Sequence, residues 1–373
     1  MQYTLHLTND CNLSCKYCGL KKNRNYMNKE TAFSAIDLAL SGSDPSVGIG
    51  FYGGEPLLCK ELISEVTAYV KCKNTNKKIF YKLITNGLLL DQKFLTFARS
   101  ENILISLSLD GNELMHDYNR TDINGNGSYQ RLLNVIPLLL AQNRYAAVMV
   151  TISPNTVKYY CDGIKNLFLL GFTNIICSLD YSANWDDTDL HELSRQYKKL
   201  AELYYSKTTS EDKFFFSPFD SKIDSHIHNK EYCRERCKLG FEQISISNNG
   251  ELYPCVQFVG DNNYKIGHVN SGIDEARRME IYKESQTVQD ECESCSIRHR
   301  CLNCCACINK YSTGDINQPS PVLCANEQLL VKVADHLAAK LYKHRNGMFI
   351  HKHYNENYSL LSLVEDSNMI IRS

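Results

Sequence analysis

The sequence lacks long apolar runs and a marked excess of charge of either sign. Its 373 residues include 41 basic and 42 acidic side chains, for a formal net charge of −1, and the basic ones are scattered in short runs. Without a basic stripe a nucleic-acid partner is not expected. No apolar segment has the length of a membrane span, and the first residues lack the layout of a signal peptide. We therefore expect a cytoplasmic protein with no membrane association.

Low-complexity segments and internal repeats of 20 to 50 residues are also missing. Cysteine, in contrast, is abundant, with 17 residues in the chain. A cytoplasmic protein of this size is kept in a reducing environment and can bury a large core, so a disulfide framework is not expected. Ligation of a metal or of an iron–sulfur cluster is the interpretation that the cysteines favour.

The first half of the chain alternates β-rich runs with segments of helical period. We expect strands at Tyr3–Thr8, Val47–Tyr52, Ile79–Thr85, Ile103–Leu109, Ala147–Ile152 and Asn174–Leu179. Apolar residues at i, i+3/i+4 spacing predict helices through Phe33, Ile36 and Leu40; Leu62, Val66 and Tyr69; Leu132, Ile136 and Leu139; Tyr160, Ile164 and Leu167; and Leu193, Tyr197, Leu200 and Tyr204. Six βα units predict the α/β class, with a parallel sheet closed or partly closed into a barrel. Ligands are expected at the carboxyl ends of the strands.

The pattern divides the chain into four parts. Residues 1–206 form the predicted barrel, and residues 207–232 form a polar and aromatic bridge. In the bridge, Phe214, Phe215, Phe216 and Phe219 either line a peptide groove or form a local core. Residues 233–325 are rich in cysteine and turns, as expected where ligands replace much of a core. Residues 326–373 resume a helical pattern to about Arg345 and end in a tail.

Three cysteines follow the first predicted strand, in the spacing Cys11-x3-Cys15-x2-Cys18. Thiolates on one tight loop can bind three irons of a four-iron cluster and leave the fourth iron open for another ligand. Half of a zinc site is the alternative. The spacing, with an aromatic residue before the third cysteine, resembles the signature of the radical SAM superfamily. The resemblance implies a partial (β/α)6 TIM-like barrel and an S-adenosylmethionine (SAM) molecule bound to the open iron, with Tyr17 near its adenine.

Other segments match this family in order. Gly53-Gly54-Glu55-Pro56 resembles the family segment whose backbone and glutamate meet the methionine amino group, although it also suits an ordinary turn. Ser108 and Asp110, within Ser-Leu-Asp-Gly, resemble the residues that bind the ribose hydroxyls. Thr85-Asn86-Gly87 also fits the family pattern. Arg131 is the predicted cation for the SAM carboxylate, and Arg120 competes for this role.

The last cysteines follow the pattern Cys237-x12-Gly250-x4-Cys255, then Cys292-x2-Cys295-x5-Cys301-x3-Cys305, then Cys324. This pattern resembles the SPASM domain of radical SAM enzymes that modify peptides and proteins. The resemblance implies two auxiliary [4Fe-4S] clusters. The first would take Cys233, Cys237, Cys255 and Cys305 as ligands, and the second would take Cys292, Cys295, Cys301 and Cys324.

Several alternatives concern these ligands. Cys304 and Cys307 flank Cys305, so any of the three is a candidate ligand. If Cys233 does not ligate, the first auxiliary cluster has an open iron that could bind a substrate thiolate. Two zinc sites are a further alternative. Four other cysteines are expected to be small buried side chains: Cys59, Cys72, Cys161 and Cys177.

The family resemblance implies a reaction on a peptide. Reductive cleavage of SAM would yield a 5′-deoxyadenosyl radical, which abstracts hydrogen from a ribosomally made peptide to form a thioether or carbon–carbon crosslink. Sulfatase-maturating relatives carry an acidic residue after the cysteine of the Gly-x4-Cys element, where this chain has Val256. Epimerisation, small-molecule modification in cofactor biosynthesis and a non-enzymatic iron–sulfur scaffold are the alternatives. Expected partners are a precursor peptide, a separate leader-binding protein, and an electron donor such as flavodoxin or ferredoxin.

Overall fold

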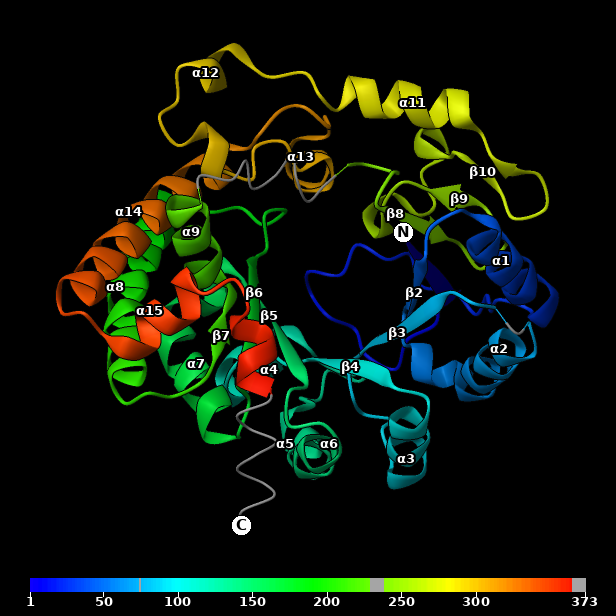
Figure 1. The fold of residues 1–373 in the computed structure, drawn as a ribbon, viewed down its shortest axis with the longest axis horizontal. Coiled ribbons are helices and arrows are strands. Elements are labelled where there is room, and N and C mark those ends of the chain that lie inside the picture. Colours follow the sequence, from blue (N-terminus) through cyan, green and yellow to red (C-terminus); the bar gives the residue numbers. More distant parts are fainter. Residues whose placement is uncertain (74, 229–237, 364–373) are drawn as a thin grey trace.

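The computed structural model describes residues 1–73, 75–228 and 238–363 (Figure 1). Its centre is a nine-stranded sheet in the order β7-β6-β5-β4-β3-β2-β1-β8-β9. The strands are β1 (Gln2–Thr8), β2 (Ser46–Gly53), β3 (Lys78–Thr85), β4 (Ile103–Ser108), β5 (Ala147–Ile152), β6 (Asn174–Leu179), β7 (Phe215–Phe216), β8 (Gln243–Ile246) and β9 (Leu252–Tyr253). Neighbours from β7 to β8 pair in parallel, and β8 and β9 pair antiparallel.

Helices surround the outer face of this curved sheet, except that α11, α12 and α13 lie along the top of the view, between α9 and the β8–β9 edge (Figure 1). They are α1 (Lys29–Ser41), α2 (Lys60–Cys72), α3 (Gln92–Ser100), α4 (Glu113–Asn119), α5 (Tyr129–Leu133), α6 (Ile136–Gln142), α7 (Tyr160–Leu169), α8 (Asp187–Thr209), α9 (Ser217–Ile227), α11 (Glu275–Glu284), α12 (Asp290–Glu293), α13 (Ala306–Thr313), α14 (Pro321–Lys343) and α15 (Gly347–Tyr354). None of the helices in the described ranges has both the length and the apolar character that a membrane crossing requires.

The predicted α/β barrel is confirmed, and all six predicted strands are present. In β1, Leu5 and Leu7 are buried with the helices, so the alternate residues Thr4, His6 and Thr8 point to the inner face of the barrel. One helix differs from its prediction. The segment carrying Leu132, Ile136 and Leu139 forms two helices, α5 and α6, because Pro137 is tolerated only in the first turn of a helix.

The predicted bridge at 207–232 has regular structure over its described part. Helix α8 runs on to Thr209, β7 extends the sheet beside β6, and α9 follows. Phe214, Phe216 and Phe219 are buried in the core, whereas Phe215 is 40% exposed. Of the two interpretations of these aromatic residues, the local core is therefore confirmed for three of the four.

The chain after Cys255 returns to the barrel through α14 and α15. Helix α14 packs on α8 and α9. The expectation of a tail after Arg345 is wrong for Gly347–Tyr354, which forms α15 with Phe349 and His353 buried. The physical reason is a polar contact that helical spacing does not reveal. The Asp220 carboxylate accepts hydrogen bonds from the Tyr204 hydroxyl at 2.5 Å and the Phe216 amide at 2.6 Å, and pairs with the Lys352 ammonium at 2.7 Å.

The ion pair of Asp220 with Lys352 is expected to stabilise the folded protein. We expect Asp220→Asn to lower the free energy of unfolding by about 3–5 kcal/mol, because it leaves the Lys352 ammonium buried without its counter-charge. Burial alone would raise the pKa of Asp220, but Lys352 and His353 hold it below its usual range. The stabilisation is therefore present above the ordinary aspartate value of about 4 and is lost as the pH falls below it.

Urea unfolding of the apoprotein between about pH 3 and pH 7 measures this effect. Asp212→Asn is the matched control, because it removes a more exposed ion pair with Lys207 at 2.7 Å, and it is expected to cost at most about 1 kcal/mol. Equal and small effects of the two substitutions would contradict the prediction.

Candidate active site

The loop with the first three cysteines follows β1 at the carboxyl end of the barrel. Backbone hydrogen bonds fasten this loop to the end of α4 and the segment after it, with the Lys16 amide donating to the Asn119 carbonyl at 2.9 Å and the Ser14 amide donating to the Thr121 carbonyl at 2.6 Å. Cys11 and Cys15 are half-buried and Cys18 is exposed. The Leu13 amide donates to the Cys11 sulfur at 3.4 Å. Three thiols on one loop therefore lie at the mouth of the barrel.

The segment after β2 packs directly against the backbone before Cys11. The Gly54 amide donates to the Thr8 carbonyl and the Glu55 amide donates to the Asp10 carbonyl, both at 2.8 Å. An ideal Cβ at Gly54 would lie 2.0 Å from the Asp10 oxygen, and one at Gly53, which has φ +132°, would lie 2.4 Å from the Thr8 oxygen. Both glycines are therefore required by this close approach.

The carboxylate of Glu55 is fully buried and points into the protein. It accepts hydrogen bonds from the Leu57 amide at 3.0 Å, the Thr85 hydroxyl at 2.7 Å and the Asn86 amide at 2.8 Å. Burial raises the pKa of Glu55. The carboxylate thus joins the ends of β2 and β3, and through the Asn86 side chain, which donates to Asn12 Oδ1 at 2.7 Å, it reaches the cysteine loop.

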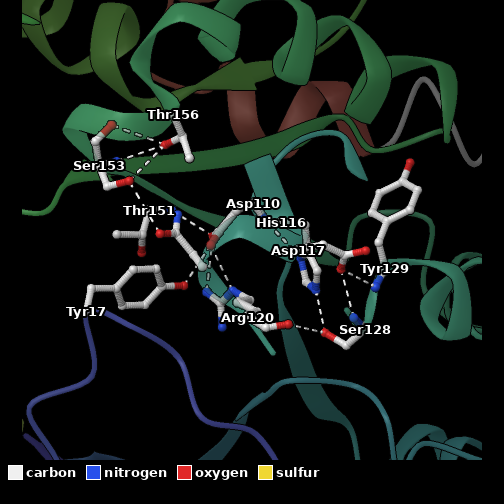
Figure 2. A network of polar contacts seen from close by, with 11 residues as sticks. Tyr17, Asp110, His116, Asp117, Arg120, Ser128, Tyr129, Thr151, Ser153 and Thr156 are labelled. Atoms are coloured by element: carbon white, nitrogen blue, oxygen red, sulfur yellow. Dashed lines mark hydrogen bonds and ion pairs between the residues drawn. The ribbon is translucent and has the colours of Figure 1, made fainter. Parts of the chain in front are cut away.

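Asp110, after β4, forms the centre of the polar network in Figure 2. Its Oδ2 accepts from the Tyr17 hydroxyl at 2.7 Å and from Arg120 Nε at 3.0 Å. Its Oδ1 accepts from Arg120 Nη2 at 3.2 Å and from the Thr151 amide at 2.9 Å. A carboxylate has about four acceptor positions, so these four bonds fill them. The Arg120 guanidinium also lies 5.3 Å from the centre of the Tyr17 ring.

His116, on α4, supports this network through hydrogen bonds to the Asp110 amide and to Ser128. The sequence did not indicate this residue as part of the site. Its Nδ1 accepts from the Asp110 amide at 3.2 Å, so Nε2 carries the proton and donates to the Ser128 hydroxyl at 2.9 Å. That hydroxyl donates to the Arg120 carbonyl at 2.8 Å (Figure 2). Burial lowers the pKa of His116 to about 3, so the ring is neutral. The imidazole therefore connects the backbones of Asp110 and Arg120.

The other predicted barrel residues are placed as follows. Ser108 ends β4 and is half-buried. Arg131 lies on α5 with its side chain exposed, whereas Arg120 is buried beside Tyr17 and Asp110. Of the two candidate cations, the structure brings Arg120 to the barrel mouth with the cysteine loop.

The later cysteines form two groups. The Cys255 and Cys307 side chains form a hydrogen bond, and the sulfurs of Cys305 and Cys307 lie 3.3 Å apart. In the other group, burial raises the pKa of the Cys324 thiol, and the nearby thiols of Cys292 and Cys295 raise it further. Burial also raises the pKa of Cys301, with a smaller contribution from Cys324. Cys233 and Cys237 lie outside the described residues. Cys305 thus lies near Cys307 and Cys255, and its assignment to the first auxiliary cluster stays a prediction.

The first cysteine loop and helix α13 meet at the barrel mouth. Tyr311, on α13, lies over the backbone that follows Cys18, and an ideal Cβ on Gly19 would lie 1.4 Å from its hydroxyl oxygen. The Gly19 amide donates to this hydroxyl. Helix α13 begins directly after Cys305, so one short helix links the second half of the chain to the first cysteine loop.

Comparison with known proteins decides the family. Residues 5–176 match the model of the radical SAM superfamily, and residues 237–305 match that of the SPASM iron–sulfur cluster-binding domain. The chain belongs to the radical SAM superfamily. It carries a C-terminal SPASM domain.

Similar proteins agree with this membership. A cysteine-type anaerobic sulfatase-maturating enzyme from Clostridium novyi is 27% identical over 320 residues, which are 80% of this chain and 83% of that protein. The fold resembles that of native anSMEcpe with bound AdoMet and the Cp18Cys peptide (TM-score 0.80, 19% identity, 92% of this chain and 99% of that one). It also resembles Streptococcus suis SuiB bound to the precursor peptide SuiA (TM-score 0.59, 15% identity, 87% and 75%).

A radical SAM enzyme with a SPASM domain uses SAM and [4Fe-4S] clusters. The donor set at the barrel mouth fits a cluster, because three thiols lie on one loop whose backbone is fixed by Asn119 and Thr121. Within the described ranges no three His, Cys, Asp or Glu side chains are arranged to hold a single metal ion. Among the remaining cysteines, Cys59 and Cys161 are buried as expected and Cys177 is half-buried. Cys72 is exposed at the end of α2, so that expectation is wrong for it.

A buried ion pair holds the SPASM cysteine Cys301 against the barrel. The Lys222 ammonium lies 2.6 Å from the Glu327 carboxylate and donates to the Arg300 carbonyl at 2.7 Å. The same carboxylate oxygen accepts from the Leu302 amide at 3.1 Å. The residues on both sides of Cys301 are therefore fixed to α9 and α14 through two side chains that are each at most 2% exposed.

We expect Glu327→Ala to lower the free energy of unfolding by about 3–5 kcal/mol, because Lys222 would remain buried without its partner. Since Leu302 is released too, iron content after reconstitution should fall by one cluster, as measured by iron and sulfide analysis. Glu192→Ala is the control, because it breaks a more exposed ion pair with Arg195 on α8. Full iron loading and wild-type stability of Glu327→Ala would contradict the prediction.

Proposed function

We propose that this radical SAM/SPASM enzyme matures a ribosomally made peptide by forming a thioether or carbon–carbon crosslink. Cys11, Cys15 and Cys18 would hold the N-terminal cluster, which would supply the electron that cleaves SAM. The 5′-deoxyadenosyl radical would then abstract one hydrogen from the peptide, and closing the crosslink would release a second electron to an auxiliary cluster and a proton to solvent. The observation that carries the proposal is the contact between Tyr311 and Gly19, which brings the SPASM domain against the cysteine loop. Substrate entering at the barrel mouth would therefore lie between the two domains.

Residues of the barrel are assigned roles in binding SAM. We assign Arg120 rather than Arg131 to the SAM carboxylate, because Arg120 is buried beside the cysteine loop and Arg131 is exposed on α5. Asp110 is assigned a positioning role, since its acceptor positions are filled by protein donors. The contact with the ribose hydroxyls of SAM is therefore assigned to Ser108 alone. The methionine amino group is assigned to the backbone of Gly53 and Gly54.

Peptide substrates are supported by the similar structures, since SuiB is seen with the precursor peptide SuiA and anSMEcpe with the Cp18Cys peptide. A precursor peptide is thus the proposed substrate, and a leader-binding protein and a flavodoxin or ferredoxin are the proposed partners. Of the alternatives, epimerisation would leave the peptide mass unchanged, and small-molecule modification would proceed without peptide.

A second candidate is oxidation of a cysteine or serine on a sulfatase. The relative from Clostridium novyi favours it, because the alignment covers most of both chains. Val256 argues against it, since this position after Cys255 is acidic in the sulfatase-maturating enzymes and an apolar side chain cannot accept a proton.

The deciding experiment measures 5′-deoxyadenosine and peptide mass together. The enzyme is reconstituted anaerobically, reduced with dithionite and given SAM, with and without a candidate precursor peptide that contains cysteine. We expect deoxyadenosine to rise with peptide and the peptide to lose two hydrogens. Cys15→Ala is the control without cleavage. Deoxyadenosine without any change in the peptide, together with oxidation of a sulfatase-derived peptide, would establish the second candidate instead.

A further inference from the structure

A row of five residues crosses the inner face of the barrel sheet. Strand pairing aligns them, from β8 through β1, β2 and β3 to β4, in the order Ser245, Thr4, Gly50, Lys82 and Leu104. Side chains alternate between the two faces of a strand, and the residues before and after Thr4 and Lys82 are buried against the helices. This lumen row therefore lies on the side of the sheet away from α1, α2 and α3 (Figure 1).

The hydrogen-bond donors of the lumen row have no partners. Thr4 Oγ1 and Gln2 Nε2 lie 3.0 Å and 3.4 Å from the position that a Cβ of Gly50 would occupy. Thr4 is only 6% exposed, yet its hydroxyl has no hydrogen-bond partner among the described residues, and the Gln2 amide has none either. The Ser245 hydroxyl, next to Thr4 in the row, is also buried without a partner within the described ranges. Buried polar groups are normally paired, so these donors indicate a ligand in the space beside Gly50.

Lys82 adds a positive charge to these donors. Its side chain is half-buried, and in the part of the chain that the structure describes its ammonium has no ion pair or hydrogen bond. Burial lowers the pKa of Lys82. The inner-face positions of β1–β6 and β8 contain no Asp or Glu, and the other lysine on this face, Lys78, is exposed at the first residue of β3. The face therefore favours an anion, and the one half-buried cation matches a single negative charge.

Two apolar side chains border Lys82. Leu104 follows it in the lumen row, and Phe80 lies two residues earlier on the same face of β3; each is 58% exposed. The lumen row is therefore open to solvent on this side. A carboxylate next to an apolar group satisfies both the donors and these side chains, whereas a phosphate dianion would call for a second cation.

We propose that Lys82, Thr4 and Gln2 bind the C-terminal carboxylate of the substrate peptide. The Lys82 ammonium pairs with one carboxylate oxygen, and the Thr4 hydroxyl and the Gln2 amide donate to the other. A chain end suits a row inside the barrel, because an internal acidic residue would need room for peptide on both of its sides. The last side chain of the peptide is then apolar and contacts Leu104 and Phe80. This inference rests on the proposed function, since that function supplies the peptide.

The first test measures acetylation of Lys82 in the reconstituted full-length enzyme, with N-acetyl-L-leucine as the ligand. Its carboxylate and apolar side chain imitate the end of a peptide, and N-acetyl-L-leucinamide is the neutral control. The enzyme is treated briefly and anaerobically with sulfosuccinimidyl acetate, and mass spectrometry gives the acetylated fraction of each lysine. We expect the acid, and not the amide, to slow acetylation of Lys82 about 10-fold, because a bound carboxylate keeps the ammonium protonated. Acetylation of Lys78 should respond to neither compound.

The second test compares the candidate precursor peptide with its C-terminus free and amidated. In the wild type, amidation should raise the KM for the peptide about 10- to 100-fold, the range expected when a charged hydrogen bond is lost. Lys82→Met should raise the KM for the free peptide by a similar factor and make the enzyme indifferent to amidation. Lys82→Arg should bring the KM back towards that of the wild type, because the charge is kept. Lys78→Met is the matched control and should have no effect.

Several outcomes overturn the proposal. They are equal acetylation of Lys82 with and without N-acetyl-L-leucine, equal protection by the amide, and an equal KM for the two peptide ends. Absence of any Lys82 acetylation would show a row closed to ligands and would also overturn it. A KM that responds instead to replacement of an internal Asp or Glu of the peptide would assign the site to a side chain and reject the chain end.

The acetylation test separates this proposal from the proposed function, because it is measured without turnover. If no crosslink forms in any peptide, the proposed function is refuted, and the carboxylate site is still decided by N-acetyl-L-leucine alone.

Discussion

Asp110→Asn should reduce 5′-deoxyadenosine formation on the order of 100-fold, as expected when a group that positions a substrate is displaced. The carboxylate accepts four hydrogen bonds, two of them from Arg120. An asparagine would present an amino group to donors on one side and would leave the buried guanidinium without its counter-charge. We also expect a loss of about 3–5 kcal/mol in the free energy of unfolding.

Two arginine substitutions compare the two candidate partners of the SAM carboxylate. Arg120→Gln should weaken SAM binding, measured by equilibrium dialysis with the reconstituted enzyme, because the proposed partner of the SAM carboxylate is removed. Arg131→Gln, at an exposed position of α5, should leave binding and stability unchanged. If Arg120→Gln bound SAM as tightly as the wild type, or if Arg131→Gln lost more SAM affinity, the SAM carboxylate would be assigned to Arg131 instead.

Gly54→Ala is expected to prevent loading of the N-terminal cluster. The added Cβ would lie 2.0 Å from the Asp10 carbonyl oxygen, and Asp10 directly precedes Cys11. Since two backbone segments cannot approach so closely, the cysteine loop must move away, at a cost of about 1–3 kcal/mol for the overpacked contact. Because Cys11 moves with the loop, the three thiols no longer converge on one cluster.

Iron analysis and SAM cleavage measure this effect. We expect Gly54→Ala to lose the iron of one cluster, to keep that of the SPASM domain, and to cleave SAM at background rates. Gly42→Ala is the matched control, since a Cβ at Gly42 meets nothing within 4 Å. Retention of all iron with normal SAM cleavage in Gly54→Ala would show that the loop tolerates the shift.

The sequence was sufficient for six strands of the sheet and for the cysteine motifs of the family, because both depend on local pattern. Buried parallel strands are continuous apolar runs, and three ligands on one loop have a short spacing. Arg120 and Arg131 could not be separated in this way, because the choice between them depends on burial, which only packing decides. His116 and Ser128 were missed for a similar reason, since a neutral histidine within a helix gives no sequence signal for its contact with Asp110.

Two elements depend on contacts between distant segments. Helix α15 is held by Lys352 on Asp220, a pair separated by more than a hundred residues, and its amphipathic spacing is weak. Strand β8 has only four residues and completes its hydrogen bonding on β1. Short strands of this kind are stabilised by the sheet that they join, so their own sequence predicts them poorly.

The pairing of β1 with β8 has a consequence for synthesis on the ribosome. Gln2 pairs with Gln243, so β1 has one edge without a partner until the chain beyond the barrel has been made. At translation rates of about 5–20 residues per second, this interval lasts on the order of 10–50 s. An open strand edge is a template for pairing with another chain. Nascent chains of this enzyme should therefore depend on chaperone cover of β1 until β8 arrives.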